Sequence, residues 1–336
     1  MIFSSLYGVD LGTDTIKLRD KTGQHFLDSK NMIAIRRGRV LAIGSDAWEM
    51  YERNPMDVEV SCPMSGGVIA SATNMELVLS YTLKKFTTFA KKSSGLCLAV
   101  PTNVTPVQQR AFFNVLRDSR QTSRVRLIDK GIADAVSIGI PVQEGKGHMI
   151  VNVGADTTEI SVICGGRVII GQTLKIGGKS LDADIVTMVR RKFNLNIGMK
   201  TAETLKNNLA FMINGPRLEQ KVFGIHTLSG LPKSDMIPSL AVSVSIVESV
   251  DRMIEQVRAV YGRVPPQVAG DIAEEGIFLT GGTSMILNLP IYMQKELGLP
   301  IYHITDPRNS TIRGILEIIN HKELKALTRA PSLYEY

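Results

Sequence analysis

Short runs of alternating apolar and polar residues open the chain, which is the pattern of β-strands joined by tight turns. These runs cover residues 7–12, 15–20, 32–37 and 39–44. Helical spacing first appears at 74–91, where apolar residues recur three or four positions apart. A buried strand is predicted at 96–101, and the helix after it has Thr105 as its N-cap and Pro106 at its first position.

The second half of the chain repeats this scheme. A strand around 124–131 and a helix at 131–140 end the first half, and a β-hairpin at 149–171 begins the second. Helices are predicted at 180–193, 201–210 and 239–261, strands at 276–280 and 300–304, and a closing helix at 309–319. Strands that alternate with helices in two halves predict an α/β protein with parallel or mixed sheets.

Two stretches of the chain resemble each other closely: "LYGVDLGTDTIKLRD" at 6–20 and "MIVNVGADTTEISVI" at 149–163. An ungapped match pairs Asp10 with Asn152, Gly12 with Gly154, Asp14 with Asp156, and Thr15 with Thr157. A strand–glycine turn–strand hairpin presents N–H groups and hydroxyls that bind phosphate, and a carboxylate at the strand end can hold Mg²⁺ through water. One such hairpin is common in β proteins, whereas a matched pair predicts duplicated domains that clamp phosphates between them.

A third glycine turn lies in "EGIFLTGGTSMI" at 275–286, between a predicted strand and a predicted helix. Gly281 and Gly282 allow the backbone to pass close to a flat ligand or its ribose, and the N-terminus of the helix adds N–H donors. Because Gly-Gly turns are common at this kind of junction, the motif supports a binding site only together with the two hairpins.

Composition agrees with a globular protein of about two domains, since 44% of the 336 residues are hydrophobic and 21% are charged. The apolar start lacks the basic residues of a signal peptide, and no apolar run is long enough to span a membrane. Cys62, Cys97 and Cys164 are expected to be buried, reduced thiols, as is typical of the cytoplasm. The five histidines are scattered, which argues against a metal site built by protein ligands.

The net charge of +7 comes from dispersed basic residues, such as Arg36, Arg37 and Arg39, Lys91 and Lys92, and Arg190 to Lys192. None of these clusters alternates with aromatic residues as a single-strand nucleic-acid surface would, so we expect no nucleic-acid partner. Two readings stay open: a solvated surface, or attraction to an anionic lipid surface.

In this order, the three turns resemble the ATPase superfamily of actin, sugar kinases and heat-shock chaperones. More narrowly, the chain from Gly8 to about Ile319 resembles the MreB family of bacterial actin-like rod-shape proteins. The resemblance is carried by the hairpins and by "PMSGGVIA" (63–70), "RLIDKGIADAVSIGIPV" (126–142), "IGMKTAETLK" (197–206), "LSGLPK" (228–233), "PPQVAGDIAEEGIFLTGGTSMI" (265–286) and "GLPIYHITDPRNSTIRG" (298–314).

The resemblance implies an α/β fold of duplicated ribonuclease-H-like domains, each a mixed sheet flanked by helices, with a nucleotide cleft between them. Its first core domain would comprise residues 1–32, 63–145 and 315–336, with a small subdomain at 33–62. The second core domain would comprise 146–180 and 240–314, with a small subdomain at 181–239.

The resemblance also implies ATP and Mg²⁺ as ligands. The implied nucleotide-binding residues are Asp10, Gly12, Thr13, Asp14, Thr15, Gly154, Ala155, Asp156, Thr157, Thr158, Gly178, Glu203, Lys206, Gly281, Gly282 and Thr283. Asp10 would hold the metal through water, with Asn152 as a weaker second position. From the residues alone, an alternative explanation of Glu203 and Lys206, three apart on a helix, is a solvated ion pair.

The chain departs from the family pattern where the attacking water would be positioned. Lys130 stands where the family has Glu, and Gly131 stands for the Pro that follows. A lysine has no acceptor and cannot orient water as a carboxylate does, so we expect position 130 to be inactive. Asp129 is next to it but, on a strand, would point to the opposite face.

The second loop departs too, because Asn152 replaces an acid and Asp156 replaces a glycine. Asp156 adds a negative charge where phosphates are expected, and one hypothesis is that Lys130 offsets it. Lys179 replaces an acid after the "IGG" turn, and Ile16 replaces a threonine in the first loop.

These departures favour an actin-like filament protein that binds ATP with weakened or absent hydrolysis and organises cell shape and cell-wall synthesis. The alternative is a competent ATPase or small-molecule kinase that uses altered residues, so the chain's status as an enzyme stays open. The catalytic Asp motif of a sugar kinase is not found, and we expect no peptide-binding domain of a chaperone.

As partners, the resemblance implies further copies of the chain or an MreB paralogue, together with membrane proteins of cell-wall elongation. It places the protein in the bacterial cytoplasm or at the inner face of the plasma membrane. A weak membrane contact through Met1, Ile2, Phe3 and Leu6 is one reading of the apolar start, and coverage of the first domain by these side chains is the other.

Overall fold

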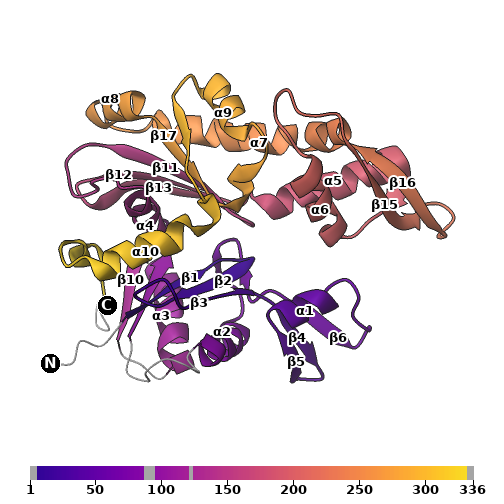
Figure 1. The fold of residues 1–336 in the computed structure, drawn as a ribbon, viewed down its shortest axis with the longest axis horizontal. Helices are drawn as coiled ribbons and strands as arrows, with labels where there is room; N and C mark the ends of the chain where they lie inside the picture. Colours follow the sequence, from indigo (N-terminus) through magenta and orange to yellow (C-terminus); the bar gives the residue numbers. More distant parts are fainter. Residues whose placement is uncertain (1–5, 87–94, 121–123, 331–336) are drawn as a thin grey trace. The chain divides into compact units, whose positions relative to one another are not determined.

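The structure is a computed structural model, and it describes residues 6–86, 95–120 and 124–330 (Figure 1). The chain forms two compact units. Unit 1 comprises Met1–Lys146, Ser161–Thr173 and Arg308–Tyr336, and unit 2 comprises Gly147–Ile160 and Leu174–Pro307. The predicted boundaries of the four subdomains remain a prediction.

The main sheet of unit 1 has the order β10-β9-β1-β2-β3. Its strands are β1 (Leu6–Leu11), β2 (Thr15–Arg19), β3 (Phe26–Lys30), β9 (Gly95–Val100) and β10 (Val125–Asp129). β9 pairs in parallel with β1 and β10, whereas β2 pairs antiparallel with β1 and β3, so the sheet is mixed, as predicted. β9 is buried along its whole length, which explains its continuous apolar run.

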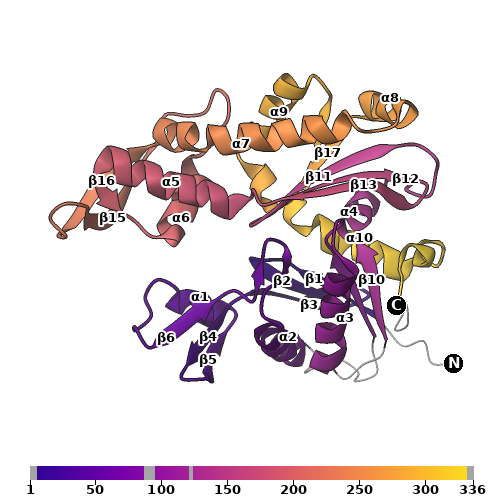
Figure 2. The same cartoon turned by 180° about the vertical axis from the view of Figure 1, so that it is seen from behind.

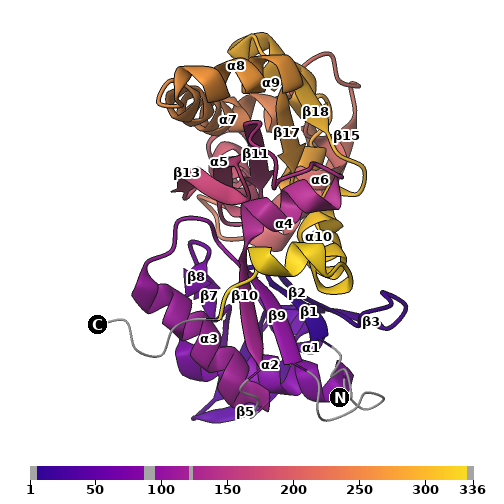
Figure 3. The same ribbon diagram turned by 90° about the vertical axis from the view of Figure 1, so that its left-hand side faces the viewer.

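Four helices cover this sheet: α2 (Ala72–Phe86), α3 (Pro106–Arg120), α4 (Lys130–Ser137) and α10 (Ser310–Asn320). Helices α4 and α10 pack together on one face, and α2 and α3 pack together on the other (Figures 1 and 3). The predicted N-cap of α3 is confirmed, because the Gln108 N–H donates to Thr105 Oγ1 at 3.3 Å. At the start of α10, the hydroxyls of Ser310 and Thr311 donate to Oδ1 of the buried Asp134, at 2.8 and 2.7 Å.

A smaller sheet of unit 1 has the order β5-β4-β6. It consists of β4 (Ile33–Arg36), β5 (Arg39–Ile43) and β6 (Val58–Ser61), with α1 (Ser45–Met50) beside it. Met32, Ala34, Ala47 and Val58 form its own small apolar core. β7 (Met64–Ser65) and β8 (Val68–Ile69) form a short hairpin.

Unit 2 contains the β11-β17-β18 part of a second sheet, whose full order is β13-β12-β11-β17-β18. The strands are β11 (His148–Val153), β12 (Thr158–Cys164), β13 (Arg167–Leu174), β17 (Ile277–Thr280) and β18 (Ile301–His303). When the first sheet is written from the edge strand β3, its order is β3-β2-β1-β9-β10. The corresponding strands of the two sheets therefore follow in the same order. This confirms the duplication predicted from the matched hairpins.

The helices of unit 2 are α5 (Gly178–Phe193), α6 (Met199–Leu209), α7 (Ser239–Tyr261), α8 (Pro266–Glu275) and α9 (Leu289–Leu297). α5 packs against both α6 and α7, as Figure 2 shows. A three-stranded sheet of β14 (Leu195–Asn196), β15 (Glu219–His226) and β16 (Pro232–Pro238) completes the unit. The 3₁₀ helices within the described residues are η2 (Gly282–Met285), which follows β17, η3 (Pro307–Asn309), which precedes α10, and η4 (Glu323–Leu327), which follows α10 in unit 1.

Several local expectations differ from the structure. Strand β3 was not predicted, because it is only partly buried and its apolar and polar residues do not clearly alternate. The helix expected to reach residue 140 ends at Ser137, two residues before Gly139, which has a φ of 79°. Cys97 is buried, and burial raises the pKa of its thiol to about 12, but Cys62 and Cys164 are only half-buried. Among the described residues, no helix combines the length and apolar character needed to cross a bilayer.

The segments expected to touch a membrane are largely outside the described residues. Met1, Ile2 and Phe3, and also Lys91 and Lys92, belong to parts of the chain that the structure does not describe. Leu6 begins β1 and is half-buried.

Candidate functional site

The first predicted phosphate loop is the turn between β1 and β2. The Gly12 N–H closes it by donating to the Thr15 carbonyl at 3.1 Å. A Cβ at position 12 would lie 2.8 Å from that carbonyl oxygen, so only glycine fits. The side-chain amide of Asn31 donates to the Gly12 carbonyl at 3.0 Å, and the Asn31 N–H donates to the Asp14 carbonyl at 2.8 Å. The loop is therefore held in a defined shape by the segment after β3.

Both carboxylates of this loop lie beside a lysine. Asp14 Oδ1 is 2.6 Å from Lys30 Nζ, and its other oxygen accepts a hydrogen bond from the Thr15 hydroxyl at 2.8 Å. Asp10 is buried, and its Oδ2 lies 3.6 Å from Lys17 Nζ. The predicted residue Thr13 is also buried. The negative charge of the first loop is thus partly neutralised by the protein itself.

The second predicted loop, between β11 and β12, closes in the same way. The Gly154 N–H donates to the Thr157 carbonyl at 2.8 Å, and a Cβ at position 154 would lie 3.1 Å from that oxygen. Thr157 is buried, whereas Asp156 is half-buried. The Thr158 hydroxyl is fully buried and donates to the Ile176 carbonyl at 2.8 Å. The sequence repeat therefore extends to the hydrogen bond that shapes each turn.

The second loop is fixed to two neighbouring elements of unit 2. The N–H groups of Gly178 and Lys179 at the start of α5 donate to the carbonyls of Gly154 and Ala155, at 3.0 and 2.7 Å. The Thr283 hydroxyl on η2 donates to the same Gly154 carbonyl at 2.8 Å. Five predicted residues of the chain therefore lie together here: Gly154, Ala155, Gly178, Thr283 and, next to Gly178, Lys206.

Lys206 is buried in this cluster. Its Nζ lies 2.8 Å from Asp182 Oδ1 on α5 and donates to the Gly178 carbonyl at 3.0 Å. The side chains of Lys206 and Asp182 are only 8% and 6% exposed. The reading of Glu203 and Lys206 as a surface ion pair is therefore wrong, because Lys206 points inward to Asp182 while Glu203 is half-buried on α6.

The third glycine turn packs against the end of β11. Asn152 pairs with Thr280 across β11 and β17, and Gly281 follows with a φ of 89°. A Cβ on Gly281 would lie 2.3 Å from the Val153 carbonyl oxygen. The space that glycine leaves at position 281 is filled by backbone of the same unit. Gly282 begins η2, so the predicted helix after the turn is a short 3₁₀ helix.

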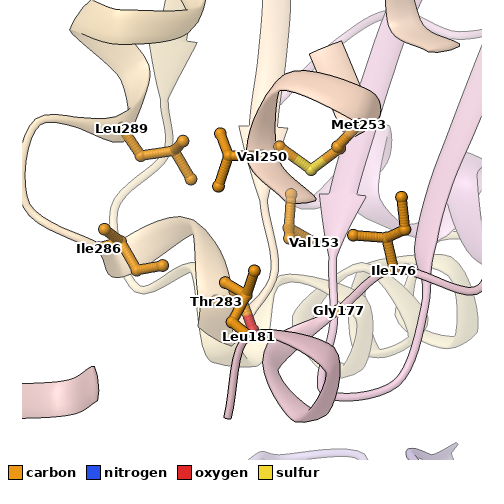
Figure 4. Close-up of a pocket in the computed structure, with 9 residues that line it drawn as sticks. All are labelled: Val153, Ile176, Gly177, Leu181, Val250, Met253, Thr283, Ile286 and Leu289. Carbon is orange, nitrogen blue, oxygen red and sulfur yellow. The ribbon is translucent and has the colours of Figure 1, made fainter. Parts of the chain in front are cut away.

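A small apolar pocket lies behind the second loop (Figure 4). Its volume of about 10 Å³ corresponds to roughly one water molecule. Figure 4 shows Val153, Gly177 and Thr283 on its loop side and Val250 and Met253 of α7 opposite. Because its lining is apolar, the pocket offers no groups for chemistry.

The positions expected near the attacking water lie at the junction of β10 and α4. Asp129 ends β10, and both of its carboxylate oxygens accept hydrogen bonds from the Arg329 guanidinium, at 2.9 and 2.7 Å. Lys130 is the first residue of α4, so the expectation that 129 and 130 are strand neighbours on opposite faces is wrong. The strand ends here because Asp129 pairs with Val100, the last residue of β9 before Pro101.

Gly131 has a local reason to replace the proline of the family. A Cβ at position 131 would lie 2.2 Å from Ser161 Oγ and 2.4 Å from Ser161 Cβ. The Ser161 hydroxyl in turn lies 2.8 Å from the Thr102 hydroxyl. Ser161 therefore occupies the space that any larger residue at 131 would need.

We expect Gly131→Ala to destabilise the protein by about 1–3 kcal/mol, because the clash with Ser161 outweighs the higher helix propensity of alanine. Thermal unfolding followed by circular dichroism measures the change. Ser161→Gly removes both clashing atoms, so the double variant should regain most of the loss. A double variant that unfolds as early as Gly131→Ala would contradict this explanation.

The sequence did not single out the charged partners of the predicted residues: Lys17, Lys30, Asp182 and Arg329. Lys17 had a usable signal, because a hairpin centred on residues 12–15 places position 17 opposite position 10. Arg329 had none, since it is far from Asp129 along the chain. No group of three or more His, Cys, Asp or Glu residues that could hold a metal ion occurs within residues 6–86, 95–120 and 124–330.

Comparisons with known proteins place this geometry in a family. The family model described as MreB/Mbl protein matches residues 4–327. The cell shape-determining protein MreB of Escherichia coli strain K12 is 31% identical over 325 residues, which cover 93% of this chain and 92% of that protein.

Solved structures agree with the sequence comparison. MreB5 of Spiroplasma citri bound to ADP superposes with a TM-score of 0.88 at 26% identity, over 93% of this chain and 95% of that one. The same protein bound to AMPPNP gives a TM-score of 0.89 at 26% identity, over 97% and 98% of the two chains. The MamK double helical filament gives 0.78 at 18% identity, over 95% and 99%, and shares the actin-like fold. With a family match over nearly its whole length, a curated relative at 31% identity and a shared overall fold, this chain belongs to the MreB/Mbl family of actin-like cell-shape proteins.

Proposed function

We propose that this protein is a cytoskeletal filament subunit that binds an adenine nucleotide, hydrolyses it slowly or not at all, and helps to organise cell shape and cell-wall synthesis. The observation that carries the proposal is the shared closure of the two loops, Gly12 N–H to Thr15 and Gly154 N–H to Thr157. Glycine turns of this kind, one in each unit, are suited to binding phosphate.

The residues present fit a nucleotide. Each loop has a glycine where a Cβ would press on the turn, at 2.8 Å for Gly12 and 3.1 Å for Gly154, and the missing side chain leaves the backbone accessible to a phosphate. In unit 2, Lys206 and Thr283 lie at Gly178, beside the second loop. The related MreB5 has been solved with ADP and with AMPPNP, which supports the same ligand class here. The nucleotide supplies the phosphoanhydride bond, and the chain positions its phosphates.

Weak hydrolysis follows from two side chains of unit 1. Lys130 offers only donors and cannot accept a proton from water. Asp129, the adjacent carboxylate, has both oxygens engaged by Arg329. A carboxylate held in a bidentate ion pair is a poor base, because accepting a proton would cost that ion pair. We therefore place the work of this protein in assembly rather than in turnover.

Assembly with further copies or with an MreB paralogue is supported by the MamK filament and by an exposed apolar face in unit 2. Phe223 and Ile225 on β15 are 71% and 53% exposed, and Leu228 in the following turn is 85% exposed. Such clustered apolar side chains are typical of surfaces that bind other proteins. We also propose membrane proteins of cell-wall elongation as partners, and a position at the inner face of the bacterial plasma membrane.

Titration with a fluorescent ATP analogue tests the proposal. The wild type should bind saturably, and Gly12→Ala or Gly154→Ala should each weaken binding by about tenfold, because the added Cβ strains the turn. Gly145→Ala is the matched control, since its Cβ would meet no atom within 4 Å. Electron microscopy should show filaments whose abundance depends on the nucleotide. A wild type without saturable binding, or equal affinity in all four proteins, would contradict the proposal.

A further inference from the structure

At the two matched positions of the repeat, one carboxylate that a divalent cation would use is missing and the other is paired with a lysine. Position 152 carries a neutral amide instead of an acid. Position 10 keeps its carboxylate, but Lys17 Nζ lies 3.6 Å from Asp10 Oδ2. Mg²⁺ needs carboxylate or phosphate oxygens around a hydrated octahedron, and an adjacent ammonium both repels the ion and competes for its ligand. These residues therefore do not fit a Mg²⁺ site.

Lys17 is held firmly in this position. It lies directly opposite Asp10 in the β1–β2 register, so both side chains project from the same face of the sheet. Its side chain is only 14% exposed, and its Nζ also donates to the Arg308 carbonyl. An ammonium has three N–H donors. With one donor on Arg308 and one directed to Asp10, a third is left for an oxygen of a ligand.

The other lysine of the hairpin is committed elsewhere. Lys30 pairs with Asp14 at 2.6 Å and lies over the Trp48 ring, 4.5 Å from its centroid. Asp14 is therefore neutralised without Lys17. Lys17 instead faces Asp10, which is the residue that the resemblance assigns to the metal.

We propose that Lys17 takes over the role of the divalent cation, so that this protein binds a nucleoside di- or triphosphate without Mg²⁺. The inference rests on the proposed nucleotide binding and names the group that neutralises the phosphates. A fixed ammonium is a suitable partner for phosphate, because it supplies a full positive charge together with N–H donors.

Affinities for ADP and ATP, measured by calorimetry in EDTA and in excess Mg²⁺, test this inference. For the wild type, the two conditions should agree within about threefold, since the phosphates are neutralised by the protein in both. Lys17→Met should lose about ten- to a hundredfold of its affinity in EDTA, as expected for the loss of a charge-assisted hydrogen bond. It should also regain a dependence on Mg²⁺, because Asp10 is then free to hold the hydrated ion.

Lys30→Met is the matched control on the same hairpin and should keep the ratio of the two affinities near that of the wild type. Circular dichroism of each variant shows whether it is folded, and Lys17→Arg, which keeps the charge, should keep binding in EDTA. Wild-type binding that requires Mg²⁺ would overturn the inference while leaving the proposed function intact. No binding under either condition would instead overturn the proposed function.

Discussion

Replacing Lys206 with methionine should lower the free energy of unfolding by about 3–5 kcal/mol, a large fraction of the stability of a typical domain. Methionine keeps the length and the apolar stem of the side chain but removes its charge. Asp182, whose side chain is 6% exposed, then keeps a buried carboxylate without its ion-pair partner at 2.8 Å. The Gly178 carbonyl also loses the N–H donor that reaches it at 3.0 Å.

Urea unfolding followed by circular dichroism measures this change as a shift of the midpoint at constant slope. Lys206→Met combined with Asp182→Leu removes both charges, and it should recover most of the lost stability because a buried ion pair is often replaceable by apolar residues. Lys192→Met, at an exposed position of α5, is the control and should stay within about 0.5 kcal/mol of the wild type. A double variant as unstable as Lys206→Met would show that the ion pair is not the cause.

The same double variant separates the structural role of Lys206 from its role in binding. Lys206 lies next to Gly178, whose N–H holds the second loop through the Gly154 carbonyl. The loop should therefore keep its shape in the double variant, while a phosphate or ribose near Lys206 would lose a cation. We expect its stability to recover and its nucleotide affinity to stay low.

The duplication was readable from the sequence because it rests on short, local signals. A glycine in a tight turn, flanked by two strands, needs only a few consecutive residues, and the match of 6–20 with 149–163 repeats those signals in order. The shared strand order and the shared closure of both turns follow from them. The long helix α7 was predicted at its observed bounds for the same reason, since its apolar stripe is continuous.

The charged partners were not readable, because each depends on which distant segments the fold brings together. Asp182 and Arg329 gave no local signal of pairing with Lys206 and Asp129, and Ser161 gave none of filling the space beside Gly131. A lysine at helical spacing from a glutamate is typical of an exposed helix face, and only the packing of α5 on α6 turns Lys206 inward to Asp182. Such contacts decide whether a family motif keeps its chemistry, so a substitution such as Lys130 needs the structure for its interpretation.

Lys130→Glu should raise the rate of phosphate release by about a hundredfold or more, if the protein binds ATP as proposed. The substitution restores an acceptor at the first residue of α4, where a carboxylate could orient water and take its proton. Positioned general bases typically contribute about 10²–10⁴ in rate. Single-turnover phosphate release at saturating ATP measures the effect separately from nucleotide exchange. Lys130→Gln is the control, since it removes the charge without adding a base and should stay near the wild-type rate.

Asp129 provides the decisive comparison with the alternative of a competent ATPase that uses altered residues. If Asp129 were the base in the wild type, Asp129→Asn would abolish an appreciable wild-type rate, and Arg329→Gln would raise that rate by releasing the carboxylate from its two hydrogen bonds. We expect neither change to exceed a few-fold, because the proposed function places the wild-type rate close to the uncatalysed one. The hypothesis that Lys130 offsets Asp156 is tested by the nucleotide affinities of Lys130→Glu, Asp156→Gly and the double variant. The effects of the two substitutions on affinity should be non-additive. The reason is that the carboxylate restored at position 130 is tolerated best once Asp156 is gone. Purely additive effects on affinity would contradict that hypothesis. Separately, a Lys130→Glu variant that binds ATP but releases phosphate slowly would show that the missing carboxylate is not what limits hydrolysis.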